Sequence, residues 1–143
     1  AAGLASIEKT ELSDLESYAV EEFCAPTLDY SMAVAFANKG AHAMCDISDA
    51  LVIQAEQLAQ ASGVQLVFDS QSFKASEEFA QLSELAEATG VDVWQWIFAG
   101  GEDHVFLATG KDLPGLCVGV VKEGSGVSGL EMKKAPDTWR HFS

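Results

Sequence analysis

Two carboxylates and a hydroxyl stand close together in the sequence at Asp46, Ser48 and Asp49. They follow a short apolar run and precede a stretch with helical spacing of apolar residues, which predicts that they lie where a strand ends and a helix begins. Ser and Asp are the commonest helix caps, and spacing alone favours that interpretation. One cap does not need two aspartates, however, and clustered carboxylates are also what a hard cation such as Mg²⁺ requires. Both interpretations stay open from the residues alone.

A second candidate is the run of two glycines and two acids at residues 100–103. Glycine pairs are typical of a tight turn into a strand, where they relieve backbone strain. Alternatively, the glycines let a ligand approach the backbone, and Glu102 is presented to that ligand. The spacing does not decide between the two.

The C-terminal segment holds a third candidate, Trp139, in an aromatic-rich run at residues 137–142. Terminal aromatics often fill a core, but an aromatic face can also stack on a flat cationic heterocycle. The histidines lack the spacing of metal ligands and do not predict a three-histidine site; they are His42, His104 and His141. The cysteines are widely spaced and flanked by apolar residues, which predicts buried, unpaired thiols in a cytoplasmic protein; they are Cys24, Cys45 and Cys117.

Residues 124–129 match the dinucleotide-binding pattern GxGxxG. That pattern binds a pyrophosphate only where it opens a helix. The residues that follow read instead as a short strand and a proline stop, so we expect a hairpin turn.

The elements that must position these residues can be predicted from periodicity and end signals. The predicted helices cover 13–23, 30–38, 46–62, 76–89 and 91–98, with Gly40, Gly63 and Gly90 closing three of them. The predicted strands cover 41–45, 64–68, 104–109, 116–122 and 130–133. Because helices and strands alternate early and strands cluster late, we expect an α+β fold in which helices pack on one mixed β-sheet.

The length of 143 residues suits a single domain, 1–143. The net charge of −14 makes nucleic acid and anionic membrane surfaces poor partners, and any phosphate substrate would arrive with divalent cations. No apolar run approaches the roughly 20 residues that span a bilayer. Since the chain starts without Met, we expect a piece of a longer protein.

Taken in order, four segments resemble the C-terminal domain of thiamine-monophosphate kinase, a family related to aminoimidazole ribonucleotide synthetase. The segments are 46–51 (DISDAL), 61–64 (ASGV), 100–106 (GGEDHVF) and 139–142 (WRHF). The resemblance covers nearly the whole chain, and the combined order is specific.

The resemblance implies transfer of the γ-phosphoryl of ATP onto thiamine phosphate, giving thiamine diphosphate, with several Mg²⁺ ions. It implies that Asp46 and Asp49 ligate Mg²⁺ and that Ser48 contacts the nucleotide phosphates. It also implies that Glu102 contacts the thiamine moiety and that Trp139 stacks on it. An N-terminal domain, absent from these residues, would supply most ATP and Mg²⁺ ligands and a homodimer interface. We therefore expect the chain alone to be inactive.

Two departures from the family pattern bear on activity. Ala50 stands where the family has glycine, which could crowd the phosphates or prevent a backbone angle, and residues 104–106 replace Tyr-Glu-Leu. These departures support an alternative, a degenerate binding module that keeps the fold. A sister enzyme acting on another phosphorylated or acyl substrate is a further alternative, against which the motifs at 46–49 and 100–103 argue.

Overall fold

The computed structural model describes residues 13–25, 29–101 and 105–132. Its helices are α2 (Asp14–Cys24), α3 (Tyr30–Asn38), α4 (Leu51–Ser62), α5 (Ser70–Lys74), α6 (Glu77–Thr89) and α7 (Val93–Ala99). Its strands are β1 (Ala43–Asp46), β2 (Gln65–Phe68), β3 (Phe106–Thr109), β4 (Gly119–Lys122) and β5 (Gly126–Ser128). The predicted α+β class is confirmed.

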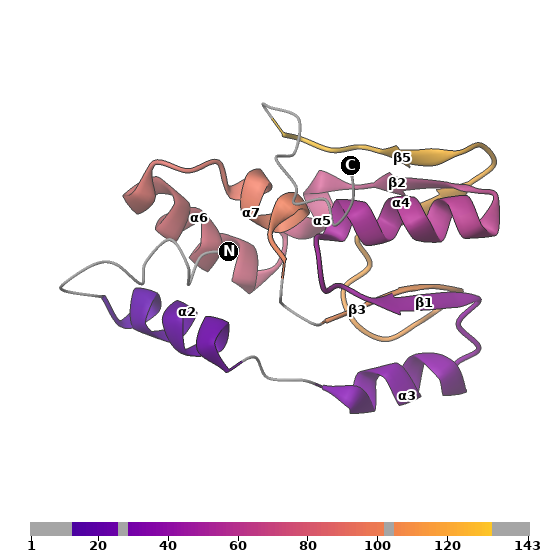
Figure 1. Cartoon of the computed structure of the whole chain (residues 1–143), viewed down its shortest axis with the longest axis horizontal. Coiled ribbons are helices and arrows are strands. Elements are labelled where there is room, and N and C mark those ends of the chain that lie inside the picture. The colour runs from indigo at the N-terminus through magenta and orange to yellow at the C-terminus, as the bar shows by residue number, and fades with distance from the viewer. Residues whose placement is uncertain (1–12, 26–28, 102–104, 133–143) are drawn as a thin grey trace.

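The described strands form two small sheets rather than the expected single one (Figure 1). In the first, β1 pairs antiparallel with β3. In the second, β2 lies between β4, which is antiparallel to it, and β5, which is parallel to it. Helix α4 contacts strands of both sheets, so the two sheets share one core through this helix.

The glycine-rich segment at 124–129 is not the predicted hairpin turn. Its residues 126–128 form β5, and β4 and β5 flank β2 on opposite sides, both meeting it at Gln65. Residues 123–125 therefore cross the start of β2 instead of joining two paired strands. The predicted strand at 130–133 is also wrong over its described part, because 130–132 are in no strand. No helix follows the glycines in 129–132, which agrees with rejecting a dinucleotide site.

The core is built around one face of α4 and a cluster of aromatic rings. Leu51, Ala55 and Ala59 are buried on that face, as their spacing predicts. Phe98 is fully buried, and its ring lies within 5.7 Å, between centroids, of three other rings. Those neighbours are Phe68, Phe73 and Trp94.

Local end signals are confirmed at several helices. The capping box at the start of α2 is present, with the Ser13 hydroxyl accepting from the Glu16 amide and the Glu16 carboxylate accepting from the Ser13 amide. The three closing glycines have positive φ, at Gly40, Gly63 and Gly90. The acids of α6 form an exposed face; they are Glu77, Glu78, Glu84 and Glu87. The short helix α5 was not predicted.

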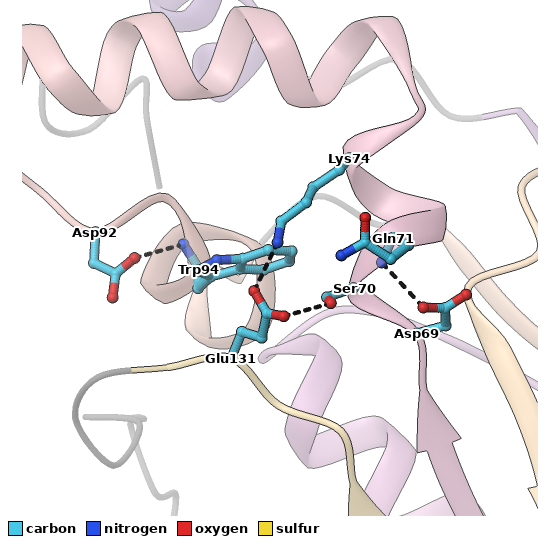
Figure 2. A network of polar contacts seen from close by, with 7 residues as sticks. All are labelled: Asp69, Ser70, Gln71, Lys74, Asp92, Trp94 and Glu131. Carbon is cyan, nitrogen blue, oxygen red and sulfur yellow. Dashed lines mark hydrogen bonds and ion pairs between the residues drawn. The ribbon is translucent and has the colours of Figure 1, made fainter.

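A polar network ties residue 131 to α5 and α7 (Figure 2). Glu131 accepts hydrogen bonds from the Ser70 hydroxyl at 2.6 Å and from Lys74 Nζ at 3.0 Å. Lys74 Nζ also lies 5.5 Å from the centroid of the Trp94 ring. In the same view, Asp69 and Asp92 accept from the backbone amides that start α5 and α7. This network lies on the surface and links the last described residues to α5.

The prediction of buried cysteines is wrong for two of the three. Cys24 and Cys117 are exposed, and only Cys45 is partly buried. Cys24 is the last residue of α2 and Cys117 precedes β4, so apolar sequence neighbours at both places did not bring the thiol into the core. None of the helices described here is long and apolar enough to cross a bilayer.

Candidate functional site

The first candidate motif forms a loop between β1 and α4, which we call the acidic loop (residues 46–50). Asp46 is the last residue of β1 and is exposed. Ile47 is buried in the core, and Ser48 and Asp49 are half-buried. The predicted helix start is therefore too early, because strand pairing with β3 extends through Asp46.

The helix-cap interpretation of Ser48 or Asp49 is wrong. The N-cap of α4 is Ala50, and no side chain caps this end in the usual way. Instead, Gln54 reaches back from the first turn of α4, and its Oε1 accepts from the Ala50 amide at 3.0 Å. Because the cap is supplied from inside the helix, the side chains of the acidic loop are not needed to satisfy that amide.

The structure brings the acidic loop together with the second motif. An added Cβ at Gly101 would lie 1.9 Å from the carbonyl oxygen of Asp49 and 3.1 Å from that of Ser48. Further along, the Ile47 amide donates to the Val105 carbonyl at 2.8 Å. The residues on either side of 102–104 therefore both contact the acidic loop.

Gly101 is glycine because another backbone needs its space. Neither Gly100 nor Gly101 has a positive φ, so the strain-relief interpretation of these glycines is wrong. We expected a ligand to approach the backbone here, whereas in the structure the segment that packs against Gly101 is the acidic loop itself. No side chain larger than hydrogen fits there without moving one of the two segments.

The residues expected to contact thiamine, Glu102 and Trp139, lie outside the described residues, as do His104 and His141. Their roles remain predictions. The described neighbour Val105 is exposed, and Phe106 pairs with Asp46 across the sheet while its ring lies 6.2 Å from that of Tyr30.

The departure at Ala50 is compatible with this backbone. Its φ of −169° and ψ of 149° are extended values that any residue adopts, so no angle reserved for glycine is required. The alanine is fully buried, which places its methyl group inside the molecule rather than on the outer side of the loop. The expected obstruction by this residue is therefore not supported.

Asp46 affects the ionisation of its sequence neighbour Cys45. Partial burial raises the pKa of the Cys45 thiol above its ordinary value, and the negative charge of the Asp46 carboxylate raises it further. A thiol with a raised pKa is a poor nucleophile at neutral pH, which agrees with the prediction that Cys45 is structural.

The donor set of the acidic loop suits a hard divalent cation. Asp46, Ser48 and Asp49 offer only oxygen atoms, which Mg²⁺ prefers. Within 13–25, 29–101 and 105–132, no group of three or more His, Cys, Asp or Glu residues could hold a metal ion. Mg²⁺ is usually held by one or two carboxylates together with water and substrate phosphates, so a magnesium site of this kind would need few protein ligands.

Gln54 is the residue of this region that sequence reasoning missed. Its Nε2 donates to Asp49 Oδ2 at 3.4 Å, while its Oε1 accepts from the Ala50 amide. The available signal was a polar residue on the buried face of α4, whose other buried members are Leu51, Val52, Ala55 and Ala59. A side-chain amide that is buried among apolar residues is expected to have specific hydrogen-bond partners.

Comparison with known proteins supports the resemblance. Thiamine-monophosphate kinase of Corynebacterium glutamicum is 42% identical over 90 residues, covering 63% of this chain and 26% of that protein. Thiamine-monophosphate kinase of Aquifex aeolicus is 34% identical over 144 residues, covering 95% of this chain and 45% of that protein. The chain thus spans less than half the length of either relative.

A solved structure, AaThiL complexed with AMPPCP and TMP, matches with a TM-score of 0.79 and 30% identity. The match covers 99% of this chain and 48% of that one. A family model described as AIR synthase related protein, C-terminal domain, matches residues 1–109, which include the acidic loop and both glycines of the second motif. The chain belongs to the family of AIR synthase related proteins, C-terminal domain.

Proposed function

We propose that this chain is the substrate-side half of a kinase that transfers the γ-phosphoryl of ATP to thiamine phosphate. The observation that supports the proposal is the close packing of Gly101 against the acidic loop, which brings together two motifs that lie some 50 residues apart in the sequence. The relatives named thiamine-monophosphate kinase and the complex of AaThiL with AMPPCP and TMP support the choice of substrates. The family model alone does not select a reaction, because one fold serves several.

In this proposal the protein positions reactants and neutralises charge, which is most of what phosphoryl transfer requires. Asp46 and Asp49 hold Mg²⁺, which offsets phosphate charge when bound, and Ser48 contacts the nucleotide phosphates. A phosphate oxygen of thiamine phosphate forms the new bond to the γ-phosphorus as the bond to ADP breaks. Glu102 contacts the cationic thiamine moiety, and Trp139 stacks on its ring.

The proposal includes a second half of the protein. An N-terminal domain would supply the remaining ATP and Mg²⁺ ligands and a homodimer interface, and this chain, 1–143, would be inactive without it. We place the protein in the cytoplasm, since the described cysteines are unpaired, which is the usual state of thiols in that compartment.

Calorimetry with thiamine phosphate tests the proposal. We expect a Kd between about 1 mM and tens of micromolar with Mg²⁺, or roughly 4–6 kcal/mol, and weaker binding with a chelator. Glu102→Ala and Trp139→Ala should each abolish binding, whereas Glu84→Ala, which removes an exposed acid of α6, should not. Binding that survives both substitutions would contradict the proposed pocket.

The alternative of a degenerate binding module draws on the departures at Ala50 and at residues 104–106. The fit of Ala50 to its backbone weakens that alternative. Thiamine diphosphate formed from ATP and thiamine phosphate by the complete parent protein would exclude it. The same product from this chain alone would refute the proposed need for a second half.

A further inference from the structure

Gln54 is a polar residue that is buried on an otherwise apolar face of α4. Its side chain is only 6% exposed, and the residues buried beside it on α4 are all apolar. A buried amide that makes no hydrogen bonds destabilises a fold, so its partners should be specific.

The two hydrogen bonds of Gln54 together fix the orientation of its side-chain amide. Oε1 accepts from the Ala50 amide at 3.0 Å, and Nε2 donates to Asp49 Oδ2 at 3.4 Å. A backbone N–H can pair only with the oxygen of the side-chain amide, which leaves the nitrogen facing the carboxylate. The side-chain amide of Gln54 therefore hydrogen-bonds both to the backbone at the start of α4 and to the side chain of Asp49.

We propose that Gln54 is a positioning residue, whose amide holds the Asp49 carboxylate in the orientation in which it binds a divalent cation. This inference rests on the proposed function, which gives Asp49 that ligand role. Partners that hydrogen-bond to metal ligands fix the ligand's orientation, and removing such a partner typically weakens metal binding about 10–100-fold.

The chemistry of the position requires both a donor and an acceptor. Gln54→Glu keeps an acceptor for the Ala50 amide but loses the donor to Asp49 and adds a negative charge beside it. Gln54→Met keeps similar bulk and loses both bonds. Gln60→Met is the matched control, because Gln60 is exposed on the same helix.

Mn²⁺, used as a paramagnetic probe in place of Mg²⁺, tests the inference on the 143-residue chain. Mn²⁺ bound at the acidic loop broadens the amide signals of residues 46–50, and the acidic face of α6 provides an internal reference. Gln54→Met should weaken Mn²⁺ binding at the loop about 10-fold. It should have no further effect in an Asp49→Ala background, since Gln54 acts through Asp49. Gln60→Met should have no effect.

A second measurement needs no metal, and it uses another variant in case Gln54→Met folds poorly. In Gln54→Glu the side-chain carboxyl ¹³C resonance of Asp49 should move while that of Asp46 stays. If the Asp49 resonance does not move, or if Gln54→Met leaves the Mn²⁺ broadening of the loop unchanged, the role of Gln54 is overturned while the proposed metal site stands. No broadening of the loop in the unmodified chain would overturn the proposed metal site and the inference with it.

Discussion

Substitution of Gly101 by alanine tests whether the two motifs form one site. The new Cβ would lie 1.9 Å from the Asp49 carbonyl oxygen, whereas real Cβ contacts essentially never fall below 3.0 Å. The two backbones must therefore separate by at least about 1.1 Å. Overpacking of this kind destabilises a fold by about 1–3 kcal/mol. A misplacement of about 1 Å in a catalytic group can slow a reaction roughly 100-fold.

Gly63→Ala is the matched control for Gly101→Ala. Gly63 has a φ of +65° and nothing within 4 Å of an added Cβ. Alanine there costs about 1–2 kcal/mol through backbone strain alone, without displacing a neighbour. The two variants should thus lose comparable stability in urea unfolding for different reasons.

The assay that separates them is the map of backbone amide shifts. Gly101→Ala should move the signals of residues 46–51, whereas Gly63→Ala should move signals near the end of α4 only. Mn²⁺ broadening at the acidic loop should weaken in the first variant and persist in the second. Loop signals that stay in place in Gly101→Ala, with unchanged stability, would show that Gly101 and the acidic loop are not in close contact.

Three further outcomes are expected. Phe98→Ala should lower the free energy of unfolding by about 3–5 kcal/mol, because the ring is fully buried among aromatic neighbours; a loss below about 1 kcal/mol in urea denaturation would contradict that packing. Alkylation followed by mass spectrometry should modify exposed Cys24 before Cys45 at neutral pH. Since the pKa of Cys45 is raised, its thiolate and its labelling rate should increase only at higher pH, and Asp46→Asn should lower that threshold. The pKa of Glu131 is lowered, first by the Ser70 hydrogen bond and then by that of Lys74, so its stabilising effect is present at neutral pH and lost as the pH falls through its lowered pKa. Glu131→Gln should therefore reduce the urea midpoint at pH 7, and this reduction should shrink as the pH falls through the lowered pKa of Glu131; a reduction that stays the same on acidification would contradict the assignment.

Elements with local signals could be predicted from the sequence, whereas the pairing of strands could not. The capping box at Ser13 and the glycine after α4 depend on residues within a few positions, and both are present. Strand β5 consists of Gly126, Val127 and Ser128, which have little strand propensity as a group. It is a strand because β2 supplies its hydrogen-bonding partners, and that contact spans some 60 residues of sequence.

The site shows the same division. The acidic loop was predicted between a strand and a helix, and it lies there. Its capping role was wrong because Gln54, one turn into α4, supplies the bond that Ser48 or Asp49 was expected to make. The reason for Gly101 could not be found in its own neighbours, because the atom that excludes a side chain belongs to Asp49.

The proposed function requires the acidic loop and the motif beginning at Gly100 to form one site for thiamine phosphate. The most direct test is a titration of thiamine phosphate, with Mg²⁺, into the isotopically labelled chain while its amide signals are followed. Binding at this site should shift the signals of residues 46–50 and of Gly101 and leave the signals of α6 unaffected. Shifts confined to other parts of the chain, or none at several times about 1 mM ligand, would contradict it.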